Sequence, residues 1–286
     1  MAIILENISY SYRPGTPFAV QALNNCSLRI SQREFVGLIG HTGSGKSTLI
    51  QQMNGLLYPT SGRVEVDGVQ VRKGRSLRAI RHKVGLVFQY PEHQLFEETV
   101  AKDVSFGPKN LGLGDDICEK RARKALGMAG LEYDDIGHRS PFDLSGGQRR
   151  RVAIAGVLAM GPSYLILDEP TAGLDPKGRR DLLSQIQMMH ETEGVGILLV
   201  THNMDEIASM AERIAVIDHG CIVMDGPTER IFARAEELEE MGLDLPETAK
   251  IVNGLRKLGL DADCGVLGVA ECAALIHRFV AGGSDA

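Results

Sequence analysis

A glycine-rich stretch, GHTGSGKST at residues 40–48, constrains the fold of this chain more than any other feature. It follows the compact apolar run EFVGLIG at 34–40 and opens KSTLIQQMNGL at 46–56, whose apolar residues recur with helical spacing. A strand, a glycine loop and a helix in immediate succession match the pattern G-x-x-x-x-G-K-[ST] in the context that it requires. We therefore expect an α/β unit with a phosphate-binding loop, or P-loop.

The chemistry of this loop follows from its residue types. Its glycines let successive backbone N–H groups point inward around a phosphate, and the N-terminus of the following helix adds a positive dipole. Lys46 is expected to reach the β- and γ-phosphates, and Ser47 is expected to ligate Mg²⁺. The residues expected around the nucleotide are Gly40, His41, Thr42, Gly43, Ser44, Gly45, Lys46, Ser47 and Thr48.

An apolar strand further along the chain ends in two carboxylates. In YLILDEP at 164–170, mostly apolar residues precede Asp168 and Glu169. In isolation such a pair more often caps the helix that follows it. With the P-loop upstream, Asp168 is expected in the magnesium shell, and Glu169 is expected to orient or deprotonate a water that attacks the γ-phosphate.

A second glycine-containing helix start lies at LSGGQRRR, residues 144–151. A serine that caps the helix and two glycines that permit close backbone approach predict another anion-binding site, formed by Ser145, Gly146, Gly147 and Gln148. One P-loop does not need a second phosphate cradle for the same nucleotide, so this cradle is expected to serve the ATP of a neighbouring molecule. The three arginines at 149–151 are interpreted as a solvated or interdomain face.

The remaining strands extend the α/β prediction. Residues 3–10 and 26–30 alternate between apolar and polar side chains, which predicts an antiparallel N-terminal sheet. The apolar run GILLVTH at 196–202 predicts another strand of a parallel sheet that is buried on both faces. Residues 214–226 predict a closing hairpin around His219 and Gly220.

Two regions are expected to be mainly helical. The stretch from about 91 to 160 predicts a helical lobe inserted between two strands of the parallel sheet, and after about 228 an acidic segment precedes two further helical stretches. The predicted fold is therefore an α/β P-loop NTPase core with an antiparallel β subdomain, an inserted α-helical subdomain and a small C-terminal helical extension.

Charge and composition exclude several classes of protein. A net charge of −6 and an isoelectric point near 5.8 argue against a chain whose main task is to coat nucleic acid, because phosphate binding needs clustered cations.

The N-terminal MAIILENISY lacks the basic leader and apolar core of a signal peptide, and no run approaches the ~18 apolar residues of a membrane helix. An odd number of cysteines without a C-x-x-C pair favours scattered thiols over a disulfide frame or a metal site. These cysteines are Cys26, Cys118, Cys221, Cys264 and Cys272.

The motifs occur in a series that is more specific than any one of them. P-loop, LSGGQ and LILDEP are joined by TAGLD at 171–175 and VTHN at 200–203, and over about residues 3–230 the chain resembles the nucleotide-binding subunit of an ABC transporter. The resemblance implies a RecA-like core, ATP and Mg²⁺ as ligands, and ATP hydrolysis coupled to transport. It places the ABC ATPase domain at 1–228 and a C-terminal extension, which helps to hold two ATPase subunits together, at 229–286.

The resemblance also implies roles for single residues. Tyr12 matches the aromatic residue that stacks on adenine, Gln89 the glutamine that reaches magnesium and the attacking water, and His202 the histidine that contacts the γ-phosphate. Asp175 would lie at the dimer interface and help to connect the two sites. The implied catalytic residues are Glu169, His202 and Gln89, and the implied magnesium ligands are Ser47, Gln89 and Asp168.

One stretch separates this chain from many other cassettes. FQYPEHQLFEETV at 88–100, followed by DVSFGPKNLG at 103–112, is similar to the ATPases of energy-coupling-factor transporters, the bacterial importers of vitamins and transition-metal ions, and within them to the second, CbiO-like, of the paired ATPase subunits. The resemblance implies three partners and no nucleic acid: a second ATPase in a homo- or heterodimer, a transmembrane coupling protein whose helices enter a groove of the helical lobe, and a substrate-binding membrane protein. The chain would then work at the cytoplasmic face of the cell membrane.

The same stretch has a physical interpretation. Leu95, Phe96 and Val100 are expected to form an apolar strip for the membrane partner, with Glu97 and Glu98 available to meet basic side chains. The simpler alternative, which the residues leave open, is that these apolar side chains pack the helical lobe.

Other classes of ABC protein remain as alternatives. Cassettes of DNA repair and chromosome organisation need a long coiled coil between the P-loop and the strand that ends in Asp168, and this interval contains no sustained heptads. Ribosome-associated proteins usually carry two cassettes in one chain, and this chain has one set of motifs. The ATPase of a conventional ABC importer or exporter is the main alternative.

Overall fold

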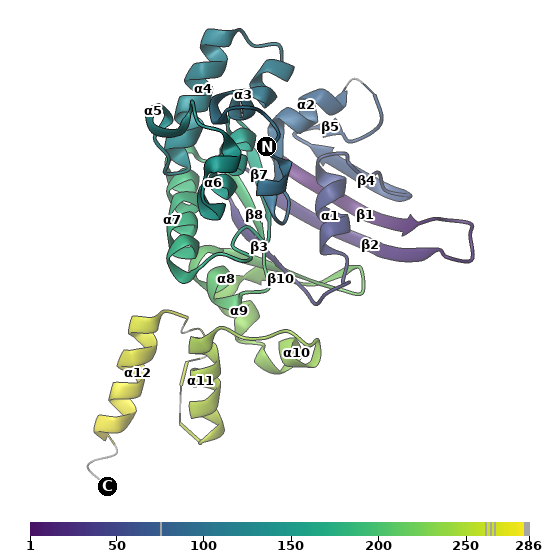
Figure 1. Ribbon diagram of the computed structural model, residues 1–286. Coiled ribbons are helices and arrows are strands. Elements are labelled where there is room, and N and C mark those ends of the chain that lie inside the picture. Colours follow the sequence, from purple (N-terminus) through teal and green to yellow (C-terminus); the bar gives the residue numbers. More distant parts are fainter. Residues whose placement is uncertain (75, 261, 264, 266, 283–286) are drawn as a thin grey trace.

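Two β-sheets organise the computed structural model of the chain, which describes residues 1–286 except 75, 261, 264, 266 and 283–286 (Figure 1). The larger sheet has the strand order β10-β9-β3-β8-β7-β6, and all its pairs are parallel except β9 with β10. Its strands are β3 (Phe35–Ile39), β6 (Val84–Val87), β7 (Tyr164–Asp168), β8 (Gly196–Val200), β9 (Arg213–Asp218) and β10 (Cys221–Pro227). The smaller sheet is antiparallel, with order β2-β1-β4-β5. It contains β1 (Ala2–Tyr12), β2 (Val20–Ser31), β4 (Ser61–Val66) and β5 (Val69–Gln70).

The central strands of the larger sheet are buried on both faces, because their apolar runs leave no polar side to meet water. Successive residues point to opposite faces and therefore enter two different cores. Phe35, Leu165, Leu167, Ile197 and Leu199 belong to the core that includes the helical lobe, whereas Val36, Leu38, Ile166, Leu198 and Val200 belong to the core that includes the antiparallel sheet. The larger sheet thus separates the two cores and contributes side chains to both.

Parallel pairing also brings the functional motifs together. β3 leads into the P-loop, β7 ends at Asp168, and β8 is followed by His202, while the register pairs Leu38 with Val200 and Asp168 with the same valine. Since the carboxyl ends of parallel strands meet at one edge of a sheet, segments far apart in sequence converge there.

Helices fill the chain between β6 and β7, in the region where the sequence predicts a helical lobe. They are η1 (Pro91–Gln94), α3 (Val100–Asn110), α4 (Asp115–Met128), α5 (Tyr133–Ile136), η2 (Pro141–Asp143) and α6 (Gly146–Leu158). The remaining helices of the body are α1 (Lys46–Met53), α2 (Ser76–Lys83), α7 (Pro176–Glu193), α8 (Met204–Met210) and α9 (Thr228–Phe232).

The end of the chain forms α10 (Ala235–Glu240), α11 (Glu247–Lys257) and α12 (Val269–Gly282). The acidic segment after residue 228 was predicted only to precede helices, but its alanine, leucine and glutamates favour a helix, and it forms α10. In Figure 1 α11 and α12 extend away from the sheets, and they share a small core of Val252, Ala262, Cys272 and Leu275. Among the described residues, none of the helices is long and apolar enough to span a membrane.

The antiparallel N-terminal pair and the closing hairpin are present as expected, although β1 and β2 are longer than the predicted strands. The hairpin turns through His219 and Gly220, both with positive φ, which suits a tight turn between strands. The thiols of Cys26, Cys118, Cys221 and Cys272 are free, while Cys264 lies outside the described residues.

Candidate active site

A cavity of about 590 Å³ lies beside the P-loop at the ends of the parallel strands. Most of the residues that the sequence predicts around the nucleotide line it. They are Tyr12, Thr42, Gly43, Gly45, Lys46, Ser47, Thr48, Gln89, Asp168, Glu169 and His202. The structure therefore gathers the P-loop, the acidic strand end and the histidine of the predicted site around one space.

The P-loop is held in shape by backbone geometry and by its lysine. Gly45 has a φ of 111°, and a Cβ atom on it would lie 2.7 Å from the carbonyl oxygen of Ala22, so no other residue fits without a shift. The Lys46 Nζ donates to the carbonyl oxygens of Gly40 at 2.6 Å and His41 at 3.0 Å. Burial lowers the pKa of Lys46, and the nearby carboxylates only partly offset this effect.

Oxygen ligands and negative charge gather beside the lysine. The Ser47 hydroxyl donates to the Asp168 carboxylate, with 3.4 Å between the oxygens. Burial raises the pKa of Asp168, the charge of Glu169 raises it further, and neither Ser47 nor Lys46 cancels these effects. Because carboxylate, hydroxyl and the amide oxygen of Gln89 are hard ligands, and because the paired carboxylates need a cation, this donor set fits Mg²⁺.

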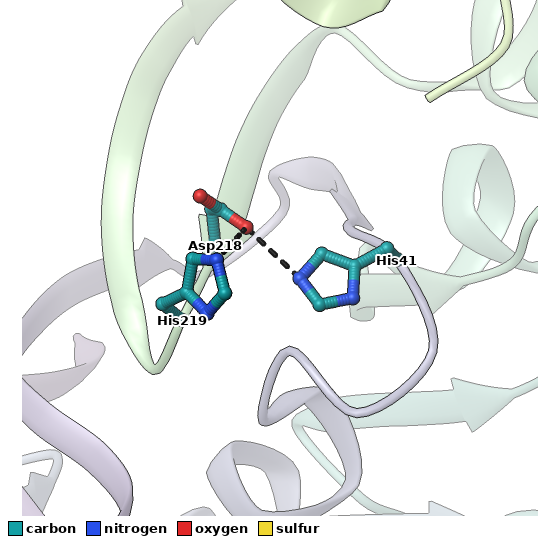
Figure 2. A group of neighbouring side chains, drawn as sticks. All are labelled: His41, Asp218 and His219. Atoms are coloured by element: carbon teal, nitrogen blue, oxygen red, sulfur yellow. Dashed lines mark ion pairs between the residues drawn. The ribbon is translucent and has the colours of Figure 1, made fainter. Parts of the chain in front are cut away.

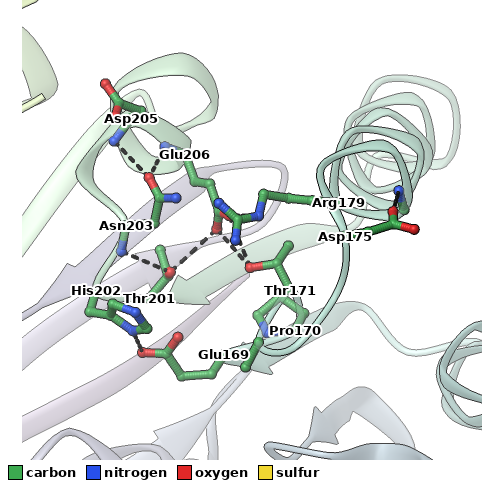
Figure 3. Close-up of polar contacts among 12 residues, drawn as sticks. Glu169, Pro170, Thr171, Asp175, Arg179, Thr201, His202, Asn203, Asp205 and Glu206 are labelled. Atoms are coloured by element: carbon green, nitrogen blue, oxygen red, sulfur yellow. Dashed lines mark hydrogen bonds and ion pairs between the residues drawn. The ribbon is translucent and has the colours of Figure 1, made fainter. Parts of the chain in front are cut away.

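The Glu169 carboxylate faces the His202 ring, and both residues line the cavity (Figure 3). Its Oε1 lies 2.9 Å from the His202 Nδ1. Glu169 also has a φ of 51°, a left-handed conformation that costs energy in a residue with a side chain. Such strain is typical of functional sites, and here it holds the carboxylate beside the P-loop, where an attacking water would be needed.

The predicted adenine contact has a defined position. The Tyr12 ring is 40% exposed, packs edge to face on Tyr10 with 4.9 Å between centroids, and has its hydroxyl 3.1 Å from the Thr48 Oγ1. It therefore lies at the open side of the nucleotide cavity, with ring surface available for stacking.

Three P-loop residues of the predicted set do not line this cavity. The Ser44 side chain is completely buried, and Gly40 lies beneath the loop against Ile217. The His41 ring leaves the nucleotide cavity and lines a different one with Asp218 and His219. Gly40 and Ser44 shape the loop backbone, whereas the side chain of His41 lies beside Asp218 and His219.

The second predicted anion site lies elsewhere on the molecule. Ser145, Gly146, Gly147 and Asp175 line a cavity of about 580 Å³ that contains none of the P-loop. Ser145 and Gln148 form a reciprocal cap, in which the Ser145 Oγ accepts from the Gln148 backbone and the Gln148 Oε1 accepts from the Ser145 backbone. The Asp175 carboxylate accepts from the Gly178 N–H at 2.6 Å and caps α7.

The family model described as ABC transporter matches residues 23–172. The energy-coupling factor transporter ATP-binding protein EcfA2 of Clostridium perfringens (strain 13 / Type A) is 53% identical over 281 residues, which cover 98% of this chain and 99% of that protein. This chain belongs to that family of ABC transporter ATPases. The protein of the same name from Caldanaerobacter subterraneus subsp. tengcongensis is 49% identical over 283 residues, with 99% of each chain covered.

Solved structures of similar fold support the assignment of this chain to the ABC transporter ATPases. The structure of cbiO1 from Clostridium perfringens, described as part of the ABC transporter complex cbiONQ, has a TM-score of 0.73 and 38% identity, and the match covers 85% of this chain and 95% of that one. A dimeric ATP-binding cassette in a post-hydrolysis state, bound to ADP and Pi, has a TM-score of 0.70 and 31% identity, with 79% and 98% covered. The RecA-like P-loop NTPase fold and the ATP-hydrolysing class are therefore established.

A buried arginine of this ABC ATPase distinguishes between the two alternatives for residues 149–151, a solvated face or an interdomain face, and at Arg150 favours the second. Arg150 is only 2% exposed. Its Nε and Nη2 donate to both carboxylate oxygens of Glu92, at 3.0 and 2.9 Å, and its Nη1 donates to the carbonyl oxygens of Pro170 and Ala172. Arg150 thus joins the start of the helical lobe to the loop that follows Glu169.

A buried carboxylate was not found from the sequence. Glu206 on α8 is 4% exposed and accepts from the hydroxyls of Thr171, at 2.9 Å, and Thr201, at 3.3 Å, while the Arg179 Nε lies 3.5 Å away (Figure 3). Burial raises the pKa of Glu206, against the hydrogen bonds and the arginine charge, which lower it. Because Thr171 follows Glu169 closely and Thr201 precedes His202, this network supports the backbone on either side of the two candidate catalytic side chains. The only sequence signal was an acidic residue in the first turn after Asn203.

The apolar strip that this chain was expected to present to a membrane partner is wrong in two of its three residues. Leu95 and Val100 are buried in the core of the lobe, because their side chains pack inward. Phe96 is 57% exposed and meets Phe106 of α3, itself 43% exposed, edge to face with 4.9 Å between ring centroids. Asp103 fixes this segment by accepting from two successive backbone N–H groups. The exposed apolar feature is therefore an aromatic pair.

Proposed function

We propose that this ABC ATPase binds ATP between its P-loop and Tyr12 and hydrolyses it to power uptake of a vitamin or a transition-metal ion through a membrane-embedded coupling protein. The observation that carries the hydrolytic part is the convergence of Lys46, Asp168, Glu169 and His202 on one cavity. The transport part is supported by full-length similarity to energy-coupling factor transporter ATP-binding proteins.

Each side chain has a role that its environment permits. Lys46, already coordinated by two carbonyl oxygens, would reach the terminal phosphates, and the P-loop amides would bind their oxygens. Glu169, oriented by the hydrogen bond with His202, would accept a proton from the attacking water. Gln89, which lines the same cavity, would help to position that water.

Ser47, Gln89 and Asp168 would hold Mg²⁺, which supplies charge neutralisation for the β- and γ-phosphates. The Ser47 hydroxyl oxygen lies 3.4 Å from the Asp168 carboxylate. The chain thus contributes an assembled pair of oxygen ligands.

We infer a head-to-tail pair of cassettes from the separation of the two cavities. Ser145, Gly146, Gly147 and Asp175 lie away from the P-loop, so they would bind the γ-phosphate side of an ATP held by a second cassette. Exposed apolar side chains on α11 and α12 support a role of the extension in holding two ATPases together. They are Ile251, Val269 and Ile276, together with Leu258, which directly follows α11.

The Phe96 and Phe106 pair is our candidate for the contact with the transmembrane coupling protein. It lies on the helical lobe that Arg150 joins to the loop after Glu169, so movement of that loop would reach the membrane partner. A substrate-binding membrane protein would complete the complex, and the ATPase would be peripheral at the cytoplasmic face of the membrane.

Replacement of Glu169 tests the hydrolytic mechanism. In the purified complex, Glu169→Gln is expected to retain ATP binding, because the P-loop is untouched, and to reduce turnover at least a hundredfold, since the general base is lost. Glu271→Gln, an exposed carboxylate on α12, is the matched control. Near-normal steady-state hydrolysis by Glu169→Gln would remove Glu169 from its proposed role.

Isolation from the native membrane tests the partners. We expect the tagged protein to be recovered with a second ATPase, a transmembrane coupling protein and a small substrate-binding membrane protein. Recovery with a two-fold permease and a separate soluble binding protein would instead favour a conventional ABC importer, which is the alternative function.

A further inference from the structure

A cluster of three side chains beside the P-loop lines a cavity that shares no residue with the nucleotide cavity (Figure 2). The His41 Nε2 lies 2.9 Å from the Asp218 Oδ1, and the His219 Nε2 lies 3.9 Å from the same oxygen. One potential ligand atom from each residue lies within 4.8 Å of the other two. The nucleotide site described above uses none of these side chains.

The backbone holds the two contributing segments together. The turn between β9 and β10 carries Asp218 and His219, and the Gly220 N–H in this turn donates to the Ser44 carbonyl oxygen at 2.9 Å. This bond joins the turn directly to the P-loop that carries His41. The cluster is therefore built on fixed backbone, and only the His219 side chain, which is 85% exposed, has wide freedom to move.

Both ring nitrogens of His41 face hydrogen-bond acceptors, which favours a cation at this position. Its Nδ1 lies 2.8 Å from the Thr42 carbonyl oxygen, an acceptor, and its Nε2 faces the Asp218 carboxylate, also an acceptor. A neutral imidazole has one N–H and cannot donate to both. With the N–H on Nδ1, the Nε2 lone pair points at a carboxylate oxygen, and a proton or a metal ion between them makes the contact favourable.

This arrangement is the one that metal-binding histidines use. A ligating imidazole donates its other N–H to a carbonyl or carboxylate, which fixes its tautomer and orientation, as the Thr42 carbonyl does here. Bonds of about 2.0–2.1 Å in a tetrahedral site separate neighbouring ligand atoms by about 3.4 Å. Metal binding therefore widens the contact between the His41 Nε2 and the Asp218 Oδ1 from 2.9 Å and shortens the one between the His219 Nε2 and the same oxygen from 3.9 Å, through small rotations of the Asp218 and His219 side chains.

We propose that His41, Asp218 and His219 bind a divalent transition-metal ion of the Zn²⁺ class, separate from the Mg²⁺ that accompanies ATP. Two imidazoles and one carboxylate favour such ions over Mg²⁺, which prefers oxygen ligands. Glu237, Glu240 and Met241 of the α10 region line the same cavity of about 460 Å³, so a carboxylate or a water takes the fourth position. The ion joins the P-loop to the β9–β10 turn beside the C-terminal extension.

The test measures metal binding by the full-length protein, not ATP turnover. Zn²⁺ is titrated in competition with a chromophoric chelator, and Co²⁺ is added as a spectroscopic probe of coordination. We expect one competing Zn²⁺ per chain and, with Co²⁺, the intense visible absorption of a tetrahedral site.

Two variants of the turn identify the ligands. His219→Asn keeps a residue that tolerates positive φ, and Asp218→Asn removes the carboxylate; both are expected to weaken Zn²⁺ binding at least tenfold and to abolish the tetrahedral Co²⁺ spectrum. His138→Asn, an exposed histidine of the helical lobe, is the matched control and is expected to bind as the unaltered protein does.

Several outcomes overturn the proposal. Equal Zn²⁺ affinity in the unaltered protein and His219→Asn would show that the metal binds elsewhere. Absence of competing Zn²⁺ at neutral pH would leave a proton as the cation between His41 and Asp218, and the cluster would be an ion pair only. Since His219 is exposed, circular dichroism of its variant is expected to be unchanged, which separates loss of ligand from loss of fold.

Discussion

Arg150 offers the sharpest test of how the helical lobe is connected to the catalytic loop. We expect Arg150→Met to keep the length of the side chain but to remove the donors for the Glu92 carboxylate and for the carbonyl oxygens of Pro170 and Ala172. Glu92 would remain with a side chain only 15% exposed and no partner for its charge.

The expected loss of unfolding free energy in Arg150→Met follows from the burial of the Arg150 and Glu92 side chains. Removal of one member of a buried ion pair costs about 3–5 kcal/mol, because the other charge stays poorly solvated. Water reaches part of Glu92, so we expect the free energy of unfolding to fall by about 3 kcal/mol, equivalent to a decrease of roughly 6 °C in Tm for a chain of this size. The control Arg151→Met removes the same charge from the same helix but only one exposed hydrogen bond, to the Gly130 carbonyl oxygen, and is expected to cost less than about 1 kcal/mol.

Acid should reduce the difference between Arg150→Met and the unaltered protein. Burial alone would raise the pKa of Glu92, but the hydrogen bonds and charge of Arg150 outweigh it and hold the pKa below its usual value. This contribution is complete above the ordinary carboxyl pKa of about 4.3 and is lost as the pH falls through the lower folded-state value.

Urea unfolding of Arg150→Met, Arg151→Met, Glu92→Met and the double variant of residues 92 and 150 provides the measurement. The double variant is expected to be at least 1 kcal/mol more stable than the two single losses predict by addition, because it leaves no unpaired charge. Equal losses for Arg150→Met and Arg151→Met, or strict additivity, would refute the structural role of the pair.

Three further predictions concern the nucleotide site and the lobe. Gly45→Ala is expected to abolish measurable nucleotide binding in an equilibrium assay, because its Cβ would collide with the Ala22 carbonyl oxygen; normal affinity would contradict this. Glu206→Gln is expected to lower kcat about tenfold with little change in KM, because the Thr171 and Thr201 supports of the catalytic side chains are weakened; an unchanged kcat would remove this role. Phe96→Asp is expected to keep the ATPase activity of the isolated protein but to reduce its recovery with the membrane partner, and undiminished recovery would exclude the aromatic pair as the contact.

The sequence predicted the fold class because its strongest signals are local. A strand, a glycine turn and a helix are specified by neighbouring residues around Lys46. Buried parallel strands are recognisable in the sequence as apolar runs, such as residues 196–200. Their convergence on one cavity then follows from parallel pairing. These features brought Asp168, Glu169 and His202 together as expected.

Side-chain partners distant in sequence were not predictable in the same way. Arg150 is indistinguishable in sequence from its neighbours, and only its helical position turns it toward Glu92 and the Pro170 carbonyl oxygen. Leu95 and Phe96 are adjacent apolar residues with opposite exposure, since the chain between η1 and α3 is irregular and has no period from which a face can be derived. His41 was assigned to the phosphates by its motif, whereas its ring meets Asp218.

Successive side chains of β3, β7 and β8 point alternately into two different cores, and this arrangement affects local unfolding of the sheet. Any local opening that separates these strands exposes apolar surface on both sides at once, so the amide protons of the sheet should exchange with solvent only through global unfolding. Helices α11 and α12 share a much smaller core of their own and should exchange much faster. Hydrogen exchange would then divide the chain into one slow unit, centred on the strands that carry the ATP site, and one fast unit at its C-terminal end.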